Sequence, residues 1–260
     1  RKTRATLPFG IGVGVGLGAG CASLASSFSR ADTGEETRCL WDKNWDGMEG
    51  SEGQASHTLV MVRHGQYISG KTDKERKLTA LGCEQAKATG KRLLELEKTG
   101  IIPPIKYTVY STMRRATETH EIINSQLGER SSKGNIPRQT RASNLIREGA
   151  VYRPEPPHPT WKPSDKSFQE DGARIESGFK TFVKRAPASE ARDYSTLLVC
   201  HGNVIRYFVL RALQLAPERW LSLTVNNASI TIVKVRSNGQ CSCSAVGDVG
   251  HFDPFKITYS

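Results

Sequence analysis

The sequence lacks the residue patterns that most metal sites and serine-hydrolase sites require. Its six cysteines are scattered over 260 residues and form no small disulfide framework, so reduced thiols are expected. Cys241 and Cys243 are one residue apart, which is not zinc-knuckle spacing. There is no His-Glu-x-x-His pair and no Gly-x-Ser-x-Gly elbow. We therefore expect no metal, no cofactor and no Ser-His-Asp triad.

Nucleic-acid signatures are also lacking, although the formal net charge is +11. No RNP, zinc-finger or helix-turn-helix pattern is present, so no nucleic-acid partner is expected. The positive net charge is explained by a solvated basic surface, or by binding to acidic lipid headgroups or to phosphorylated substrates. With 37% hydrophobic residues, the chain is long enough for one domain of about 200 residues and an appendage.

Between Arg4 and Arg30 the sequence has no charged residue. The stretch Leu7–Phe28 is apolar and follows three basic residues, and it has the roughly 20 residues needed to span a bilayer. Glycine at every second position from Gly10 to Gly20 gives small-xxx-small steps that suit close helix packing in a membrane. A membrane anchor, a cleaved secretory signal and an organellar presequence all fit. We favour a transmembrane or targeting segment over 1–30.

Residues 31–56 have the composition of a linker, with one unusual motif inside it. Trp41, Asp42, Trp45 and Asp46 form a Trp-Asp-x-x-Trp-Asp pattern. Exposed tryptophans in a polar segment are unfavourable. Either both rings pack on their own domain, or they dock on another subunit, where tryptophan is a frequent hot spot.

From His57 onward, buried strands alternate with amphipathic helices, which predicts one α/β domain over 57–260. The sheet should be mostly parallel, with helices on both faces. The predicted strands are Thr58–Val62, Tyr107–Tyr110, Thr196–Cys200 and Ile230–Val235. The predicted helices are Thr79–Lys98 closed by Gly100, Thr112–Gln126, Asp171–Lys184 and Asn203–Leu213. Five prolines in Gly149–Lys166 predict a stiff loop over one end of the sheet.

Two of the predicted strands run directly into histidine. His64 follows Thr58–Val62 after one arginine, and His201 follows Thr196–Cys200. Ligands bind beyond the carboxyl ends of strands in parallel sheets, so neighbouring strands would bring both histidines into one crevice. One histidine in such a place is commonly structural, but two indicate a functional site.

Phosphate is the ligand that suits this crevice. Arg63 beside His64 offers a planar, permanently charged fork to phosphoryl oxygens. The segment Ser111–Ala116 opens a helix after the Tyr107–Tyr110 strand and brings further arginine to the same edge. A helix N-terminus also favours an anion.

Four motifs resemble the histidine phosphatase superfamily, in its phosphoglycerate-mutase-like branch. Leu59–Gly65 is similar to the signature with the first histidine, and Ser111–Thr119 to the second motif. Leu145–Gly149 resembles the segment with the acidic residue, and His201–Asn203 the second histidine motif. The four occur in the family's order and span nearly all of 57–260.

This resemblance implies a role for each matching residue. His64 would attack phosphorus and become a phosphohistidine. Arg63, Arg115 and His201 would hold the equatorial oxygens. Glu148 would give a proton to the leaving oxygen and then take one from water.

The sequence also resembles the mitochondrial protein serine/threonine phosphatases of this superfamily. They carry an N-terminal anchor, a Trp-Asp-x-Asn-Trp-Asp oligomerisation motif and a stretch like Glu170–Glu176. The resemblance implies a single-pass anchor in a mitochondrial membrane, with the outer preferred and the inner open, and a homo-oligomer. Its substrates would be phosphorylated proteins, stress-activated kinases among them, in cell-death or mitochondrial-dynamics signalling.

Other functions stay open at this point. A mutase signature usually continues Arg-His-Gly-Glu-Ser, whereas Gln66, Tyr67, Ile68 and Ser69 follow here, which disfavours a phosphoglycerate mutase. A small-molecule phosphatase and a mitochondrial scaffold with residual activity are the remaining alternatives.

Overall fold

The computed structural model describes residues 41–49 and 53–259. The predicted membrane segment, 1–30, and the first part of the predicted linker, 31–40, lie outside the described residues. Among the described residues, no helix combines the length and the apolar character that crossing a bilayer requires.

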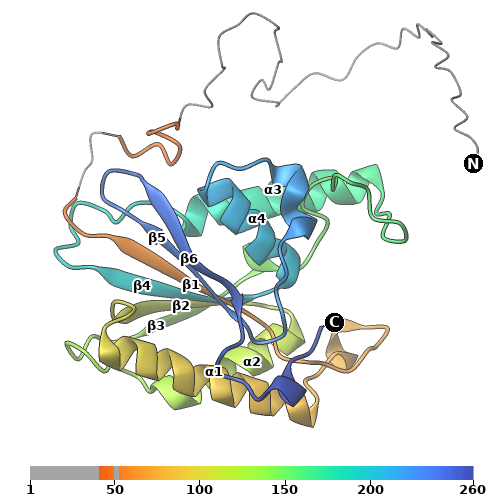
Figure 1. Ribbon diagram of the computed structural model, residues 1–260, viewed down its shortest axis with the longest axis horizontal. Helices are drawn as coiled ribbons and strands as arrows, with labels where there is room; N and C mark the ends of the chain where they lie inside the picture. The colour runs from red at the N-terminus through yellow and green to blue at the C-terminus, as the bar shows by residue number, and fades with distance from the viewer. Residues whose placement is uncertain (1–40, 50–52, 260) are drawn as a thin grey trace, which may run out of the picture. The chain divides into compact units, whose positions relative to one another are not determined.

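A six-stranded sheet forms the centre of the described chain, in the order β3-β2-β4-β1-β5-β6 (Figure 1). The strands are β1 (His57–Arg63), β2 (Ile105–Ser111), β3 (Gln139–Ser143), β4 (Tyr194–Cys200), β5 (Ile230–Val235) and β6 (Cys241–Asp248). The first four are parallel, β5 is antiparallel to β1, and β6 is antiparallel to β5. The predicted mostly parallel sheet is confirmed.

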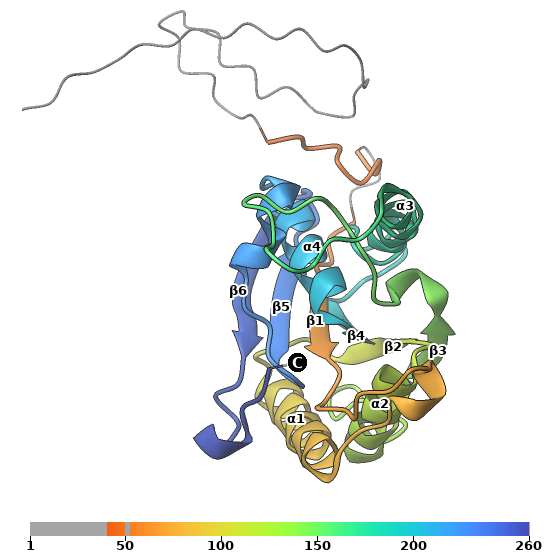
Figure 2. The same cartoon turned by 90° about the vertical axis from the view of Figure 1, so that its right-hand side faces the viewer.

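Two edge strands were not predicted from the sequence. β3 is almost wholly exposed, and β6 alternates half-buried and exposed residues with register shifts against β5. Figure 2 shows them at opposite edges of the sheet. Because edge strands bury little and tolerate polar residues, neither has the apolar run that identifies the central strands.

Two helices cover each face of the sheet, α1 and α2 on one side and α3 and α4 on the other (Figure 1). They are α1 (Ala80–Thr99), α2 (Arg114–Leu127), α3 (Asp165–Phe182) and α4 (Gly202–Ala212). Short 3-10 helices occupy Asp73–Glu75, Asn144–Ile146, Pro217–Ser222 and Pro254–Lys256. This arrangement confirms the predicted helices on both faces.

The predicted helix ends are right for α1 and wrong for α3. Thr79 caps α1 by accepting a hydrogen bond from Gly82 N, and Gly100 ends it in the left-handed region with φ 80°. α3 begins at Asp165, six residues before the predicted start. The cause is Ser164, whose hydroxyl accepts from Ser167 N and caps the helix earlier.

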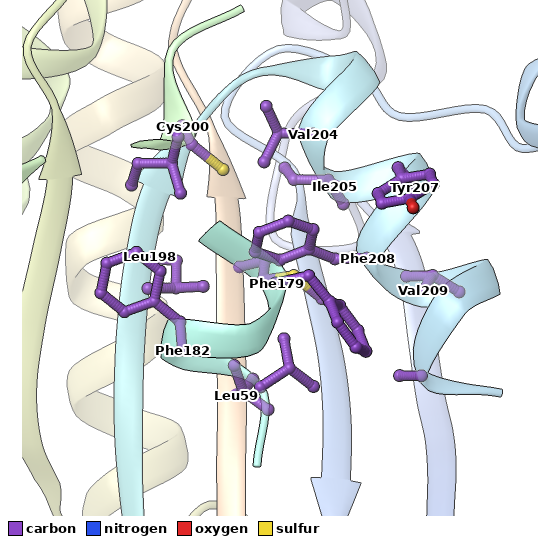
Figure 3. Close-up of a cluster of buried hydrophobic side chains, with 14 of the residues drawn as sticks. Leu59, Phe179, Phe182, Leu198, Cys200, Val204, Ile205, Tyr207, Phe208 and Val209 are labelled. Carbon is purple, nitrogen blue, oxygen red and sulfur yellow. The ribbon is translucent and has the colours of Figure 1, made fainter. Parts of the chain in front are cut away.

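The central strands are buried on both faces because their side chains alternate between two apolar cores. Leu59 and Leu198 point toward α3 and α4, where they meet Phe179 and Phe208 (Figure 3). The side chains that point to the other face, among them Val60 and Val62, pack against α1 and α2. A strand covered on both sides has a continuous apolar sequence, which is why β1 and β4 could be recognised.

The Trp-Asp motif packs on its own domain, and the compact unit runs from Trp41 to Ser260. The Trp45 indole lies against Phe179, with ring centroids 5.7 Å apart, and its Nε1 donates to Gly239 O at 2.8 Å. Asp46 forms a buried ion pair with Arg185 and accepts from Arg185 N at 2.9 Å. Asp42 N donates to the Gln214 side chain. Of the two alternatives, the contacts in this chain show packing within the subunit; whether the motif also joins subunits stays a prediction.

The Asp46–Arg185 pair should be a large local contribution to stability. Its side chains are 1% and 3% exposed, so Asp46→Ala leaves a buried guanidinium without its carboxylate and should lower the free energy of unfolding by about 3 to 5 kcal/mol. Urea unfolding measures this. The matched control is Arg153→Ala, whose pair with Asp165 is 63% and 80% exposed and should change stability by less than about 1 kcal/mol.

The same pair predicts a pH dependence. Burial raises the pKa of Asp46, but hydrogen bonds from Arg185 outweigh burial and the pKa is lowered overall. The pair's contribution to the free energy of unfolding is therefore complete above the ordinary carboxyl pKa of about 4, and it is lost as pH falls through the lower pKa of the folded state.

In the urea experiment, equal losses of stability in Asp46→Ala and Arg153→Ala would contradict a structural role for the Asp46–Arg185 pair.

Candidate active site

The carboxyl ends of β1, β4 and β2 bring the predicted histidines together. β1 and β4 pair with Arg63 opposite Cys200, so His64 and His201 follow adjacent strands at the same level. Their ring centroids are 5.2 Å apart. The crevice predicted from the two strand ends is therefore present in the fold.

His64 is buried, and one hydrogen bond defines its tautomer. Nδ1 lies 2.9 Å from the Gly65 carbonyl oxygen, which can only accept, so Nδ1 carries the proton. Nε2 is then unprotonated, and it accepts from Arg115 Nε at 3.1 Å. A neutral imidazole with an unprotonated Nε2 is the form required of a nucleophile.

The backbone around His64 is fixed on all sides. His64 N donates to Cys200 O at 3.0 Å, and its carbonyl accepts from Ala228 N at 3.1 Å. Gly65 N donates to the Thr119 hydroxyl at 3.0 Å. A Cβ on Gly65 would lie 2.6 Å from the Gly82 carbonyl oxygen, so only glycine allows the loop this close to α1.

Arg115 and Arg63 supply two buried cations to the site. Arg115 lies 4.8 Å from the Tyr67 ring centre, and no hydrogen-bond acceptor for its Nη1 is found among the described residues. Arg63 Nη1 donates to Val225 O at 2.7 Å. Burial lowers the pKa of both guanidiniums, yet both stay charged because the ordinary value is above 12.

His201 is held at the start of α4 by a serine from β2. Its Nε2 lies 2.8 Å from the Ser111 hydroxyl, and its Nδ1 has no hydrogen-bond partner among the described residues. Because buried polar atoms are normally paired, this nitrogen and Arg115 Nη1 both indicate a place for an acceptor-rich ligand. Phosphoryl oxygens supply such acceptors.

Glu148 reaches the site after β3 and the 3-10 helix Asn144–Ile146. Its carboxylate accepts from Gly149 N at 3.2 Å and from Asn203 N at 3.5 Å. Burial raises its pKa, while Gly149 N and the charges of Arg63 and Arg115 oppose that rise. The two histidines and two arginines are buried, and Glu148 as a whole residue is half-buried.

The same burial keeps both histidines neutral. Burial lowers the pKa of His64 well below 6.5, and Arg115 and Arg63 lower it further. Burial also lowers the pKa of His201 well below 6.5, and His64, Arg115 and Arg63 lower it further. Both rings are therefore uncharged at neutral pH, and the positive charge of the site resides on the arginines.

All five predicted site residues meet at this sheet edge, and two further residues join them. Tyr67 stands edge-on to His64 with centroids 5.1 Å apart. Arg206, on α4, donates to Asn203 Oδ1 at 3.4 Å and lies close enough to Glu148 for that carboxylate to raise its pKa against the lowering by burial. In the sequence, only the position of Arg206 one helical turn after Asn203 of the His201 motif could have pointed to it. The neighbouring Arg114 instead pairs with Glu118 and is 43% exposed.

Cations and N–H donors, rather than metal ligands, dominate the site. Among the described residues, no three His, Cys, Asp or Glu side chains converge on a point that could hold a metal ion. The arrangement suits binding of a phosphoryl group, with neutral imidazoles, guanidiniums and a carboxyl around it.

Comparison with known proteins assigns the family. Residues 59–248 match the family described as histidine phosphatase superfamily (branch 1), and the chain belongs to that superfamily. It is 42% identical over 246 residues to the serine/threonine-protein phosphatase Pgam5, mitochondrial, of Caenorhabditis briggsae, covering 85% of this chain and 81% of that protein. The human protein of the same name is 39% identical over 249 residues, covering 85% and 81%.

Solved structures share the fold. A phosphoglycerate mutase from Plasmodium falciparum is 25% identical with a TM-score of 0.51, covering 79% of this chain and 99% of that one. A structure named mycobacterial hydrolase 1 is 21% identical with a TM-score of 0.52, covering 74% of this chain and 99% of that one. The phosphoglycerate-mutase-like fold expected from the sequence is confirmed.

Proposed function

We propose that this chain is a protein serine/threonine phosphatase that works through a phosphohistidine on His64. The supporting observation is the His64 ring, with its proton held on Nδ1 by Gly65 O and its Nε2 facing Arg115. The related proteins are named serine/threonine-protein phosphatases, which supports a phosphoprotein substrate.

In the first step, His64 Nε2 attacks phosphorus in line and the bond to the serine or threonine oxygen breaks. Arg115 Nε, which donates to His64 Nε2, shifts its hydrogen bond to a phosphoryl oxygen. Arg63 and His201 bind the other equatorial oxygens. These donors act where charge is delocalised in the transition state, in a site that excludes most water.

Glu148 handles the protons. Its raised pKa favours the protonated carboxyl, which donates to the leaving alkoxide as the P–O bond breaks. In the second step the resulting carboxylate takes a proton from water, whose oxygen attacks phosphorus. The P–N bond breaks, the electron pair returns to His64 Nε2, and inorganic phosphate leaves.

A mutase is the second candidate, since one structural neighbour is a phosphoglycerate mutase. A mutase must keep its phosphorylated sugar acid bound while the phosphoryl group passes from the histidine back to that acid. Here the residue pair after the signature is Gln66-Tyr67, and Tyr67 lies against both His64 and Arg115. Gln66 accepts from the Thr79 hydroxyl at 2.8 Å and does not add a cation. These contacts favour the phosphatase.

We also propose the cellular setting. The relatives are named mitochondrial, and the apolar segment 1–30 suits a single-pass anchor, in the outer membrane by preference. Phosphorylated signalling proteins at that membrane, stress-activated kinases among them, are the proposed substrates. Self-association through Trp41, Asp42, Trp45 and Asp46 is part of the proposal.

His64→Ala should abolish turnover because it removes the Nε2 atom that forms the bond to phosphorus. We expect a loss of at least about 10³-fold on both an aryl phosphate and a phosphothreonine peptide, with an unchanged melting temperature. Rapid quenching should trap an acid-labile phosphoryl group on the parent and none on the variant. Equal turnover in the two proteins would reject His64 as the nucleophile. Transfer to a phosphoglycerate would favour the mutase.

Glu148→Gln should affect poor leaving groups far more than good ones. An alkoxide needs a proton, so kcat/KM on the phosphothreonine peptide should fall about 10²-fold or more. A nitrophenolate leaves without help, so the loss there should stay below about tenfold. In the parent, kcat/KM on the peptide should decline as pH rises through the Glu148 pKa, and the variant should lack that decline. The control is Glu170→Gln, an exposed carboxylate on α3. Equal losses on both substrates would contradict the acid role.

Trp45→Ala tests the assembly proposal. If the motif joins subunits, the full chain carrying the variant should sediment as a smaller species than the parent. Trp161→Ala, which removes an indole packed on Trp220 and Phe168 outside the motif, should leave sedimentation unchanged. An unchanged size for Trp45→Ala would limit the motif to its contacts within one subunit.

A further inference from the structure

We propose that Asp73 is a built-in competitor of the substrate's phosphoryl group for Arg115, and so limits how tightly the site holds inorganic phosphate. The proposal rests on the phosphatase function proposed above. It assigns a role in substrate and product affinity to a carboxylate that belongs to none of the four motifs.

Asp73 and Arg115 face each other across a short gap. Asp73 Oδ1 lies 3.7 Å from Arg115 Nη1, beyond hydrogen-bond distance but within ion-pair range. Both atoms are buried, and neither has a hydrogen-bond partner among the described residues. Nη1 belongs to the guanidinium whose Nε touches His64, so the carboxylate stands beside the nucleophile's own cation.

The position of Asp73 does not depend on Arg115. Its other oxygen, Oδ2, accepts from Arg114 N at 3.0 Å at the start of α2, where a negative charge is favourable. Arg114 also donates to the carbonyl of Lys74, and Ile68 N donates to Lys77 O at 2.8 Å across the base of the segment. The carboxylate is therefore held in place whether or not Arg115 turns toward a ligand.

A phosphoryl group that binds Arg115 must approach this carboxylate. Like charges a few ångströms apart repel strongly near a protein interior, although the 36% exposure of the Asp73 side chain weakens the effect. The repulsion acts equally on bound substrate and on bound phosphate. Asp73 thus offsets part of the attraction of Arg63 and Arg115, which favours release of the product.

The test is Asp73→Asn, which keeps an oxygen to accept from Arg114 N and removes the charge. We expect the inhibition constant of inorganic phosphate against an aryl phosphate to fall roughly tenfold, with a matching fall in KM and a smaller change in kcat. Asp73→Glu keeps the charge and should stay within about threefold of the parent. Glu75→Gln is the matched control, because Glu75 lies in the same 3-10 helix and binds Lys71 N rather than Arg115.

Each outcome decides the proposal. Tighter binding of inorganic phosphate in Asp73→Asn alone supports the proposal. Unchanged or weaker phosphate binding overturns it, as does an equal gain in Glu75→Gln, which would reflect net charge alone. Calorimetric titration of the full chain with phosphate, without turnover, separates this proposal from the proposed function. A protein that binds phosphate more tightly as Asp73→Asn but hydrolyses nothing would keep the first and reject the second.

Discussion

The parallel pairing of β1 with β4 is the constraint on which the site depends. It sets Arg63 opposite Cys200, and the ladder continues one step further when His64 N donates to Cys200 O at 3.0 Å. The backbone of His64 is thus the last link of the central ladder rather than part of a separate loop. A slip of one residue would exchange the two faces of β1 and turn His64 away from His201.

Burial then determines the chemistry of the residues placed there. It lowers the pKa of both histidines and raises that of Glu148, so bases stay neutral and the acid keeps its proton more readily. Only the guanidiniums remain charged when buried, because their ordinary pKa is so high that burial does not lower it to neutral pH. One environment therefore gives ordinary side chains the properties that the proposed nucleophile, acid and cations need.

The sequence predicted the parts of the site that follow directly from buried strands. β1 and β4 are apolar on both faces, so their ends, and hence His64 and His201, could be located from hydrophobic pattern alone. Glu148 follows β3, an exposed strand without such a pattern, and was found only by family resemblance. Tyr67 and Arg206 were missed because their roles depend on which helix face or loop side meets the site, which spacing does not reveal. The early start of α3 depends on one cap, Ser164, inside a proline-rich stretch that suggested a loop.

The balance of charge explains how such a site can both bind and release phosphate. Two buried arginines with neutral histidines attract a dianion strongly, and a site of cations alone would retain its product. Two carboxylates oppose this attraction from different elements: Glu148 after β3 and Asp73 in the segment after β1. Glu148 can lose its negative charge by taking a proton, as its raised pKa allows, whereas Asp73 accepts a hydrogen bond from Arg114 N at the N-terminus of α2. In the proposed scheme one carboxyl moves protons, while the other repels the bound phosphate and so favours its release.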